Sequence, residues 1–245
     1  MSGSTASLDA VFADHRAAWA QKRALRLYYQ REIFARVVAE LRPGRTLEVG
    51  TGPGFFADFH PGMTGLDVES CHPGVVAGDA HAMPFADATF DNVAMIDVLH
   101  HLACPGRALG EMARVLAPAG RVVLVEPWTG PLGRLFYRYL HHEDCSPVAD
   151  PWNQAFAPGK AAMDGNAMIP QTLLAARASE LGHHAPLRLS RVEPFGIFSY
   201  AATGGFRKLG LPWPVIHVLC RIENGLSRRL RDFAALRALF VLERV

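Results

Sequence analysis

The sequence predicts an α/β protein built on a doubly wound, mostly parallel sheet of seven strands. Two observations lead to this prediction: short apolar segments of strand character alternate with helical segments, and a glycine-rich loop follows the first of these apolar segments. Alternation of this kind is typical of parallel sheets that helices cover on both faces. The expected strands are residues 45–50, 63–67, 75–79, 90–97, 121–127, 187–192 and 239–245.

The N-terminal segment is expected to form one long helix over residues 8–41, because apolar residues recur there at helical spacing. Ser7 is its candidate N-cap, and a Pro-Gly pair follows its end. The two connections after the glycine-rich loop are too short for full crossovers, so we expect one short helix and one plain loop there. Further helices are expected over residues 106–116 and 171–181.

The bulk composition is that of an ordinary globular protein, with 245 residues, of which 50% are hydrophobic and 20% charged. A net charge of +2 argues against a dedicated nucleic-acid binder. The four cysteines are far apart and form no CxxC pair, so neither a disulfide framework nor a cysteine zinc site is expected. The N-terminus has no secretory signal pattern. We therefore expect reduced thiols and a cytoplasmic location.

The glycine-rich loop lies in the stretch TLEVGTGPGFF, residues 46–56. Glycine permits sharp turns with positive φ and lets a ligand approach the bare backbone. The loop leads into a helix N-terminus, whose free N–H groups attract anionic groups. At the carboxyl end of a parallel strand, Gly50, Gly52 and Gly54 therefore predict a ligand cradle. Their spacing does not match the dinucleotide fingerprint G-x-G-x-x-G, because the third glycine comes one residue early.

Acidic residues end the next two predicted strands. Asp67 ends the second, where a carboxylate can accept hydrogen bonds from both hydroxyls of a ribose. Asp79, followed by Ala80, ends the third, where a carboxylate and a backbone N–H suit the edge of an adenine. Each residue alone also fits an ordinary turn, but together they favour a ligand with a nucleoside part.

Linked motifs over residues 45–127 resemble those of class I S-adenosylmethionine-dependent methyltransferases, in the small-molecule branch called methyltransferase type 11. The segments that carry the resemblance are EVGTGPG, GDAHAMPFADATFDNVAMIDVLHHL and EMARVLAPAGRVVLVEP, in this order. The last has Ala119 where the family has the first glycine of P-G-G-R. The resemblance implies a Rossmann-like sheet with a reversed last strand, S-adenosylmethionine as the cofactor and S-adenosylhomocysteine as its product.

The resemblance also implies roles for individual residues. Glu48 would orient the glycine loop and meet the cofactor's ammonium through water, and Ile96 would lie along the methionine moiety. Asp67 would hold the ribose, with Glu69 two residues on as an alternative partner, and Asp79 with the backbone of Ala80 would hold the adenine. The implied cofactor-binding set is Glu48, Gly50, Thr51, Gly52, Gly54, Asp67, Val68, Asp79, Ala80 and Ile96.

The whole chain, residues 1–245, is expected to be one methyltransferase domain. Its parts would be an N-terminal helical segment (1–44), the cofactor-binding core (45–127) and a substrate-pocket or lid region with an irregular insertion after the fifth strand (128–245). The first helix and the segment after the fifth strand are expected to supply an apolar acceptor pocket. Its candidate aromatic side chains are Tyr28, Tyr29, Trp128, Phe136, Tyr137, Tyr139 and Trp152.

Paired histidines are the candidates for a general base, which an alcohol or phenol acceptor would need near neutral pH. His100 and His101 follow the fourth strand, near the expected methyl position, although such a pair also suits a strand cap. The stretch HHEDC, residues 141–145, clusters two histidines and two acids. Neighbouring residues rarely converge on one ion, so we expect a solvated surface there and no metal site in the chain.

Residues 209–233 join aromatic and aliphatic side chains to four arginines, a pattern that suits either a covering helix or peripheral contact with a membrane surface. The expected function is methyl transfer from S-adenosylmethionine to a small-molecule or lipid-like acceptor, with no nucleic-acid partner. Two alternatives stay open: a nicotinamide-dependent oxidoreductase, and a non-catalytic cofactor-binding sensor or scaffold protein.

Overall fold

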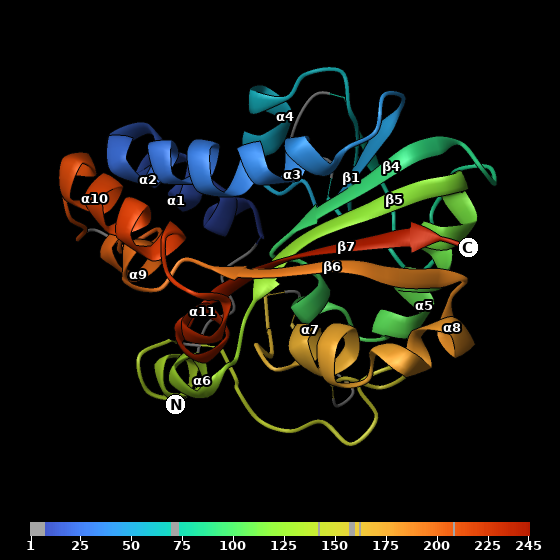
Figure 1. The fold of residues 1–245 in the computed structure, drawn as a ribbon. Helices are drawn as coiled ribbons and strands as arrows, with labels where there is room; N and C mark the ends of the chain where they lie inside the picture. The colour runs from blue at the N-terminus through green and yellow to red at the C-terminus, as the bar shows by residue number, and fades with distance from the viewer. Residues whose placement is uncertain (1–7, 70–73, 142, 157–159, 162, 208) are drawn as a thin grey trace.

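The computed structural model describes residues 8–245 apart from 70–73, 142, 157–159, 162 and 208. It contains a seven-stranded sheet in the order β3-β2-β1-β4-β5-β7-β6 (Figure 1). Strands β1 to β5 pair in parallel, and β7 runs antiparallel to both β5 and β6, so the predicted reversed last strand is confirmed. The strands are β1 (Thr46–Val49), β2 (Thr64–Asp67), β3 (Val75–Ala77), β4 (Phe90–Ile96), β5 (Leu116–Pro127), β6 (Leu187–Phe195) and β7 (Arg237–Arg244).

Helices cover both faces of the sheet. Figure 1 shows α3 and α4 on one face and α5, α7 and α8 on the other. The α-helices are α1 (Leu8–Gln21), α2 (Arg23–Tyr28), α3 (Ala35–Glu40), α4 (Phe55–Phe59), α5 (Pro105–Val115), α6 (Pro131–Tyr139), α7 (Ile169–Gln171), α8 (Leu181–His184), α9 (Phe198–Ala202), α10 (Trp213–Asn224) and α11 (Arg228–Ala234). Among the described residues, no helix combines the length and apolar character needed to cross a lipid bilayer.

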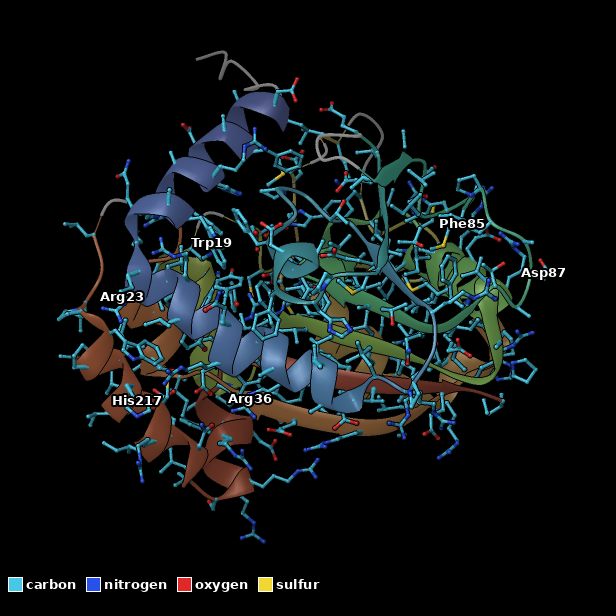
Figure 2. All side chains as sticks on the ribbon, turned by 90° about the horizontal axis from the view of Figure 1, so that it is seen from above. Trp19, Arg23, Arg36, Phe85, Asp87 and His217 are labelled. Carbon is cyan, nitrogen blue, oxygen red and sulfur yellow. The ribbon has the colours of Figure 1, made fainter. Side chains whose placement is uncertain are left out.

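The single long N-terminal helix predicted over residues 8–41 is wrong in two places. The chain leaves helical geometry at Lys22, between α1 and α2, and it forms a π-helical segment at Tyr29–Phe34 before α3. Helical periodicity does not reveal these breaks, because apolar residues recur at near-helical spacing on both sides of them. Viewed from above in Figure 2, these helices lie across the sheet, with Trp19 on α1 and Arg36 on α3. The candidate N-cap Ser7 lies outside the described residues.

The other helix predictions hold in part. The short helix after the glycine loop is α4, and the expected plain loop before β3 lies mostly outside the described residues. The helix predicted over residues 171–181 is instead a series of short pieces, α7, a π-helical turn at Thr172–Ala176, a 3-10 turn at Ala178–Glu180, and α8.

The sheet divides the core into two apolar layers, because successive side chains on a strand point to opposite faces. Along β4, Val93 and Met95 pack in the layer that includes α5, whereas Ala94 packs in the layer under the N-terminal helices. The N-terminal layer includes Ile33 and Val37. This burial on both faces fixes the strand ends from which the functional loops emerge.

Candidate active site

A cavity of about 1040 Å³ opens at the carboxyl ends of β1, β2 and β4. Every residue of the cofactor-binding set expected from the sequence lines it except Gly54, and both candidate bases line it too. Parallel α/β sheets place ligand sites at this edge. The structure thus brings the predicted residues together around one space.

The glycine loop follows β1 in the conformation that the sequence suggested. Gly50, Gly52 and Gly54 have φ values of +74°, +50° and +85°, which residues other than glycine rarely adopt. A Cβ at Gly50 would lie 2.3 Å from a methyl carbon of Val98, so glycine is required there for packing as well. The backbone N–H of Gly52 donates to Oδ2 of Asp67 at 2.7 Å. The ends of β1 and β2 are therefore tied together through the loop.

Two buried oxygens at the end of β1 and in the loop after it have no hydrogen-bond partner among the described residues, namely Oε2 of Glu48 and Oγ1 of Thr51. The side chains of both residues are almost fully buried, with Glu48 only 4% exposed. Burial, and secondarily the nearby charge of Asp67, raises the pKa of Glu48 to about 8. An unpaired buried carboxyl costs free energy, so this position is suited to a cationic ligand group that would pair with it.

Asp79 and Ala80 lie at the far side of the cavity, beyond the end of β3. Oδ1 of Asp79 accepts hydrogen bonds from the backbone N–H of His81 at 2.9 Å and from its Nδ1 at 2.7 Å. The Asp79 side chain is 61% exposed, whereas Ala80 is buried. The turn holds the carboxylate at the cavity rim.

His100 is fixed by a buried carboxylate at the end of β5. Its Nδ1 lies 2.5 Å from Oε2 of Glu126, whose Oε1 accepts the backbone N–H groups of Val98 and Leu99. Burial alone would lower the pKa of His100, but Glu126 and then Glu143 raise it to about 10. A histidine held in the protonated form has no free nitrogen with which to accept a proton from an acceptor.

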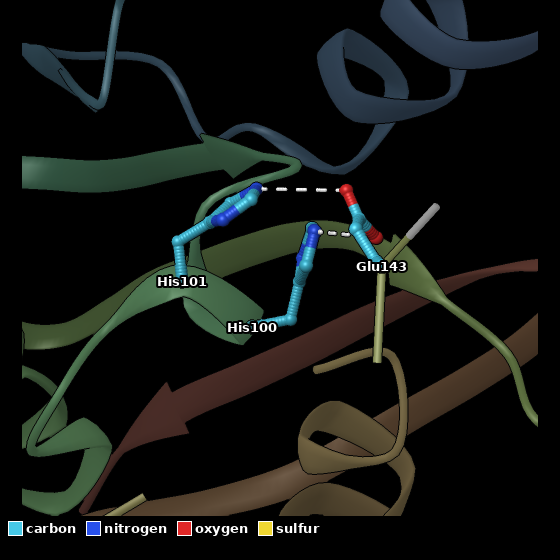
Figure 3. Close-up of side chains that lie close together, drawn as sticks. All are labelled: His100, His101 and Glu143. Atoms are coloured by element: carbon cyan, nitrogen blue, oxygen red, sulfur yellow. Dashed lines mark ion pairs between the residues drawn. The ribbon is translucent and has the colours of Figure 1, made fainter. Parts of the chain in front are cut away.

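His101 and Glu143 complete this cluster (Figure 3). Glu143 lies 3.5 Å from Nε2 of His100 and 3.9 Å from Nε2 of His101, and its side chain is 12% exposed. The expectation of a solvated surface over residues 141–145 is therefore wrong for Glu143, because the chain after α6 folds this carboxylate into the cavity. Burial and the charge of His100 lower the pKa of His101 to about 4. The His142 position lies outside the described residues.

Only some of the aromatic side chains predicted to form the acceptor pocket line the cavity. Tyr29, Phe136 and Tyr137 line the cavity. The remaining candidates do not: Tyr28, Trp128 and Trp152 are buried elsewhere, and Tyr139 is 69% exposed. Phe206, which sequence reasoning did not select, also lines the cavity and stacks on His15 of α1 at a ring-centroid distance of 4.1 Å.

Sequence reasoning also missed Glu126 and an ion pair in the cavity wall. Arg237 on β7 is 2% exposed and pairs with Asp97 at 2.6 Å, and both residues line the cavity. Glu126 carried a usable signal, because a lone acidic residue at the end of a β-branched strand needs a buried partner. Arg237 opens a strand whose next five residues, 238–242, are all apolar, and it carried the same signal.

Residues 47–124 match a family model described as a methyltransferase domain. A demethylmenaquinone methyltransferase from Renibacterium salmoninarum is 43% identical over 68 residues, which are 26% of this chain and 29% of that protein. A demethylmenaquinone methyltransferase from Deinococcus radiodurans is 34% identical over 123 residues, 41% of this chain and 51% of that protein. The chain thus spans about half, or less, of the length of these relatives.

The fold comparison covers the chain more fully. A crystal structure of an S-adenosylmethionine-dependent methyltransferase from Thermotoga maritima aligns over 97% of this chain and 98% of its own, with a TM-score of 0.57 and 16% identity. At this identity the likeness concerns the fold alone. Residues 47–124 therefore match the methyltransferase-domain model, and the chain as a whole shares its fold with a solved S-adenosylmethionine-dependent methyltransferase.

Proposed function

We propose that this protein transfers a methyl group from S-adenosylmethionine to a small acceptor with a flat, quinone-like ring. The observation that carries the proposal is the unpaired Oε2 of the buried Glu48 carboxyl, which lies beside a positive-φ glycine loop in a cavity of about 1040 Å³. S-adenosylmethionine bears an ammonium and a sulfonium group, so it supplies the positive charge that this buried carboxyl is suited to pair with. The ring class comes from the relatives that methylate demethylmenaquinone.

Different residues of the site would bind different parts of S-adenosylmethionine. Glu48 and Thr51 would meet the amino-acid part, Asp67 and Val68 the ribose, and Asp79 with Ala80 the adenine. Asp67 already accepts the N–H of Gly52 through Oδ2, so binding the ribose there would couple it to the glycine loop. Ile96 and Gly54 would shape the path of the methionine moiety.

When bound, the cofactor supplies an activated methyl group on sulfur, and the protein's part is positioning and exclusion of water. Tyr29, Phe136, Tyr137 and Phe206 provide an apolar wall on which a flat acceptor would stack. His100 and His101 stay candidates for acid-base work, but the raised pKa of His100 favours a charged, orienting role over that of a base.

Methyl transfer is tested directly with methyl-labelled S-adenosylmethionine and a chemically reduced naphthoquinone, with Asp67→Ala as the inactive control. We expect label in the quinone with the wild-type protein and at least tenfold less with the variant. Oxidation of the quinol with NAD as hydride acceptor and no label transfer would favour the oxidoreductase alternative. Cofactor binding without transfer to this or any extract acceptor would favour the sensor alternative.

A peripheral membrane contact is a second part of the proposal, because a quinone-like acceptor dissolves in lipid. On α10, Ile216 and Cys220 are buried, whereas Val215, Val218 and Ile222 are 44%, 55% and 58% exposed. Leu230 and Phe233 on α11 are exposed too, and the side chain of Arg228 on the same helix is 71% exposed. An exposed apolar helix face with arginines nearby suits an anionic lipid surface.

A further inference from the structure

Three potential metal ligands converge on the acceptor side of the cavity from two distant parts of the chain. The Nε2 atoms of His100 and His101 and the carboxylate of Glu143 supply ligand atoms that all lie within 4.8 Å of one another. In Figure 3 both imidazole rings point toward the Glu143 carboxylate. The histidines follow β4 directly, whereas Glu143 comes from the segment after α6.

The orientation of each ring directs Nε2 toward Glu143, and a metal ion would displace the proton that His100 carries on this nitrogen. Nδ1 of His101 lies 3.1 Å from the backbone carbonyl of Asp164, which can only accept, so Nδ1 carries the proton. Nδ1 of His100 faces Glu126 at 2.5 Å. Metal-binding histidines characteristically donate their second N–H to a carboxylate or a backbone carbonyl, and both arrangements occur here.

The spacing suits a transition metal ion. Bonds of about 2.0–2.2 Å to imidazole and carboxylate place two ligand atoms of a tetrahedral site roughly 3.4 Å apart. The contacts of Glu143 with His100 and His101, at 3.5 and 3.9 Å, are close to this separation, and the three ligand atoms all lie within 4.8 Å of one another. The buried carboxylates of Glu126 and Glu143 would offset the two charges of the ion.

The backbone at Gly165 and Asn166 packs closely against the two histidines. A Cβ at Gly165 would lie 2.8 Å from Cε1 of His101 and 3.0 Å from Cδ2 of His100. The N–H of Asn166 donates to the carbonyl of His100 at 3.0 Å. Gly165 and Asn166 therefore pack against the two histidines, whose Nε2 atoms face Glu143.

We propose that His100, His101 and Glu143 bind one divalent transition-metal ion through two imidazole nitrogens and a carboxylate, with its remaining coordination positions open to the cavity. This set suits zinc, iron or cobalt. The proposal departs from the sequence prediction that the chain has no metal site. Resting on the proposed function, it further assigns an acceptor that carries a hydroxyl or keto oxygen on its ring, since such an oxygen would occupy an open position and orient the ring toward the methyl group.

Metal binding is tested on the full chain after treatment with a chelator, by titration with Co²⁺ followed in the visible spectrum and by displacement with Zn²⁺. We expect one equivalent to bind, with the absorption bands of a nitrogen- and oxygen-ligated ion. Glu143→Gln and His101→Ala are expected to weaken the affinity at least tenfold. His183→Ala, which changes an exposed histidine on α8, is the matched control and should leave the affinity unchanged.

Circular dichroism melts show whether each variant folds, and Gly165→Ala, which would displace both rings without removing a ligand, gives an independent second variant. No stoichiometric binding by the wild-type protein, or equal affinity in Glu143→Gln, Gly165→Ala and the wild type, would overturn the metal site. Titration of the same samples with S-adenosylhomocysteine separates the two proposals. Its binding without Co²⁺ binding removes only the metal site, and the reverse removes only the cofactor site.

Discussion

At the scale of single residues, burial raises the pKa of Glu48 far above its usual value. Its pKa of about 8 in the folded protein compares with 4.5 in an unfolded chain. Between these values the folded protein holds a proton that the unfolded chain has released, so stability falls as pH rises through this window. The full loss is on the order of 5 kcal/mol.

Glu48→Gln removes this titration, so the variant is expected to lose much less stability between pH 5 and pH 8 than the wild-type protein does. Urea denaturation at several pH values measures the difference, with Glu69→Gln, an exposed carboxyl nearby, as the control. Parallel stability profiles for the wild type and Glu48→Gln would show that the buried carboxyl is not proton-linked to folding.

At the scale of elements, the break between α1 and α2 places Lys22 where it anchors a segment that lines the cavity. Nζ of Lys22 donates to the backbone carbonyls of Thr203, Gly205 and Arg207 at 2.7, 2.6 and 2.8 Å. The segment held in this way carries Phe206, which covers one side of the cavity. The interruption of the N-terminal helix therefore anchors a covering segment from the C-terminal half of the chain.

Lys22→Met removes the ammonium group, so the carbonyls of Thr203, Gly205 and Arg207 lose their hydrogen bonds to it. Hydrogen bonds to a charged donor contribute about 1.5–3 kcal/mol, so we expect local opening of this segment and weaker retention of S-adenosylhomocysteine. Hydrogen exchange measured over residues 203–207 tests the prediction. Arg23→Met, one residue away and exposed, should leave the exchange rates unchanged, and similar rates in both variants would contradict the anchor.

The elements also show what local sequence can reveal. The strands and the glycine loop were predictable, because apolar runs and Gly-x-Gly-x-Gly have local causes. The inward fold of Glu143, the Lys22 contacts and the pairing of Arg237 with Asp97 were not, since each joins residues far apart in the chain. The charged residues over 141–145 indicated a solvent-exposed surface. In the structure, the packing of this loop against His100 buries most of the Glu143 side chain instead.

At the scale of the whole molecule, the apolar surface of α10 and α11 would bring the protein to a membrane. Val218→Ser with Ile222→Ser is expected to abolish co-flotation with vesicles containing phosphatidylglycerol, because it removes exposed apolar area and leaves the arginines in place. Val76→Ser, a change at an exposed position on edge strand β3, is the control. Failure of the wild-type protein to float with these vesicles would contradict the contact.

The central claim is that the glycine loop with Glu48 and Asp67 binds S-adenosylmethionine. Its most direct test is calorimetric titration of the full chain with S-adenosylmethionine, S-adenosylhomocysteine and NAD, repeated on Asp67→Ala and Glu69→Ala. We predict micromolar binding of both sulfur compounds, none of NAD, a loss of about 1.4 kcal/mol or more in Asp67→Ala, and unchanged binding in Glu69→Ala. Absence of heat with both sulfur compounds, or tighter binding of NAD, would contradict it.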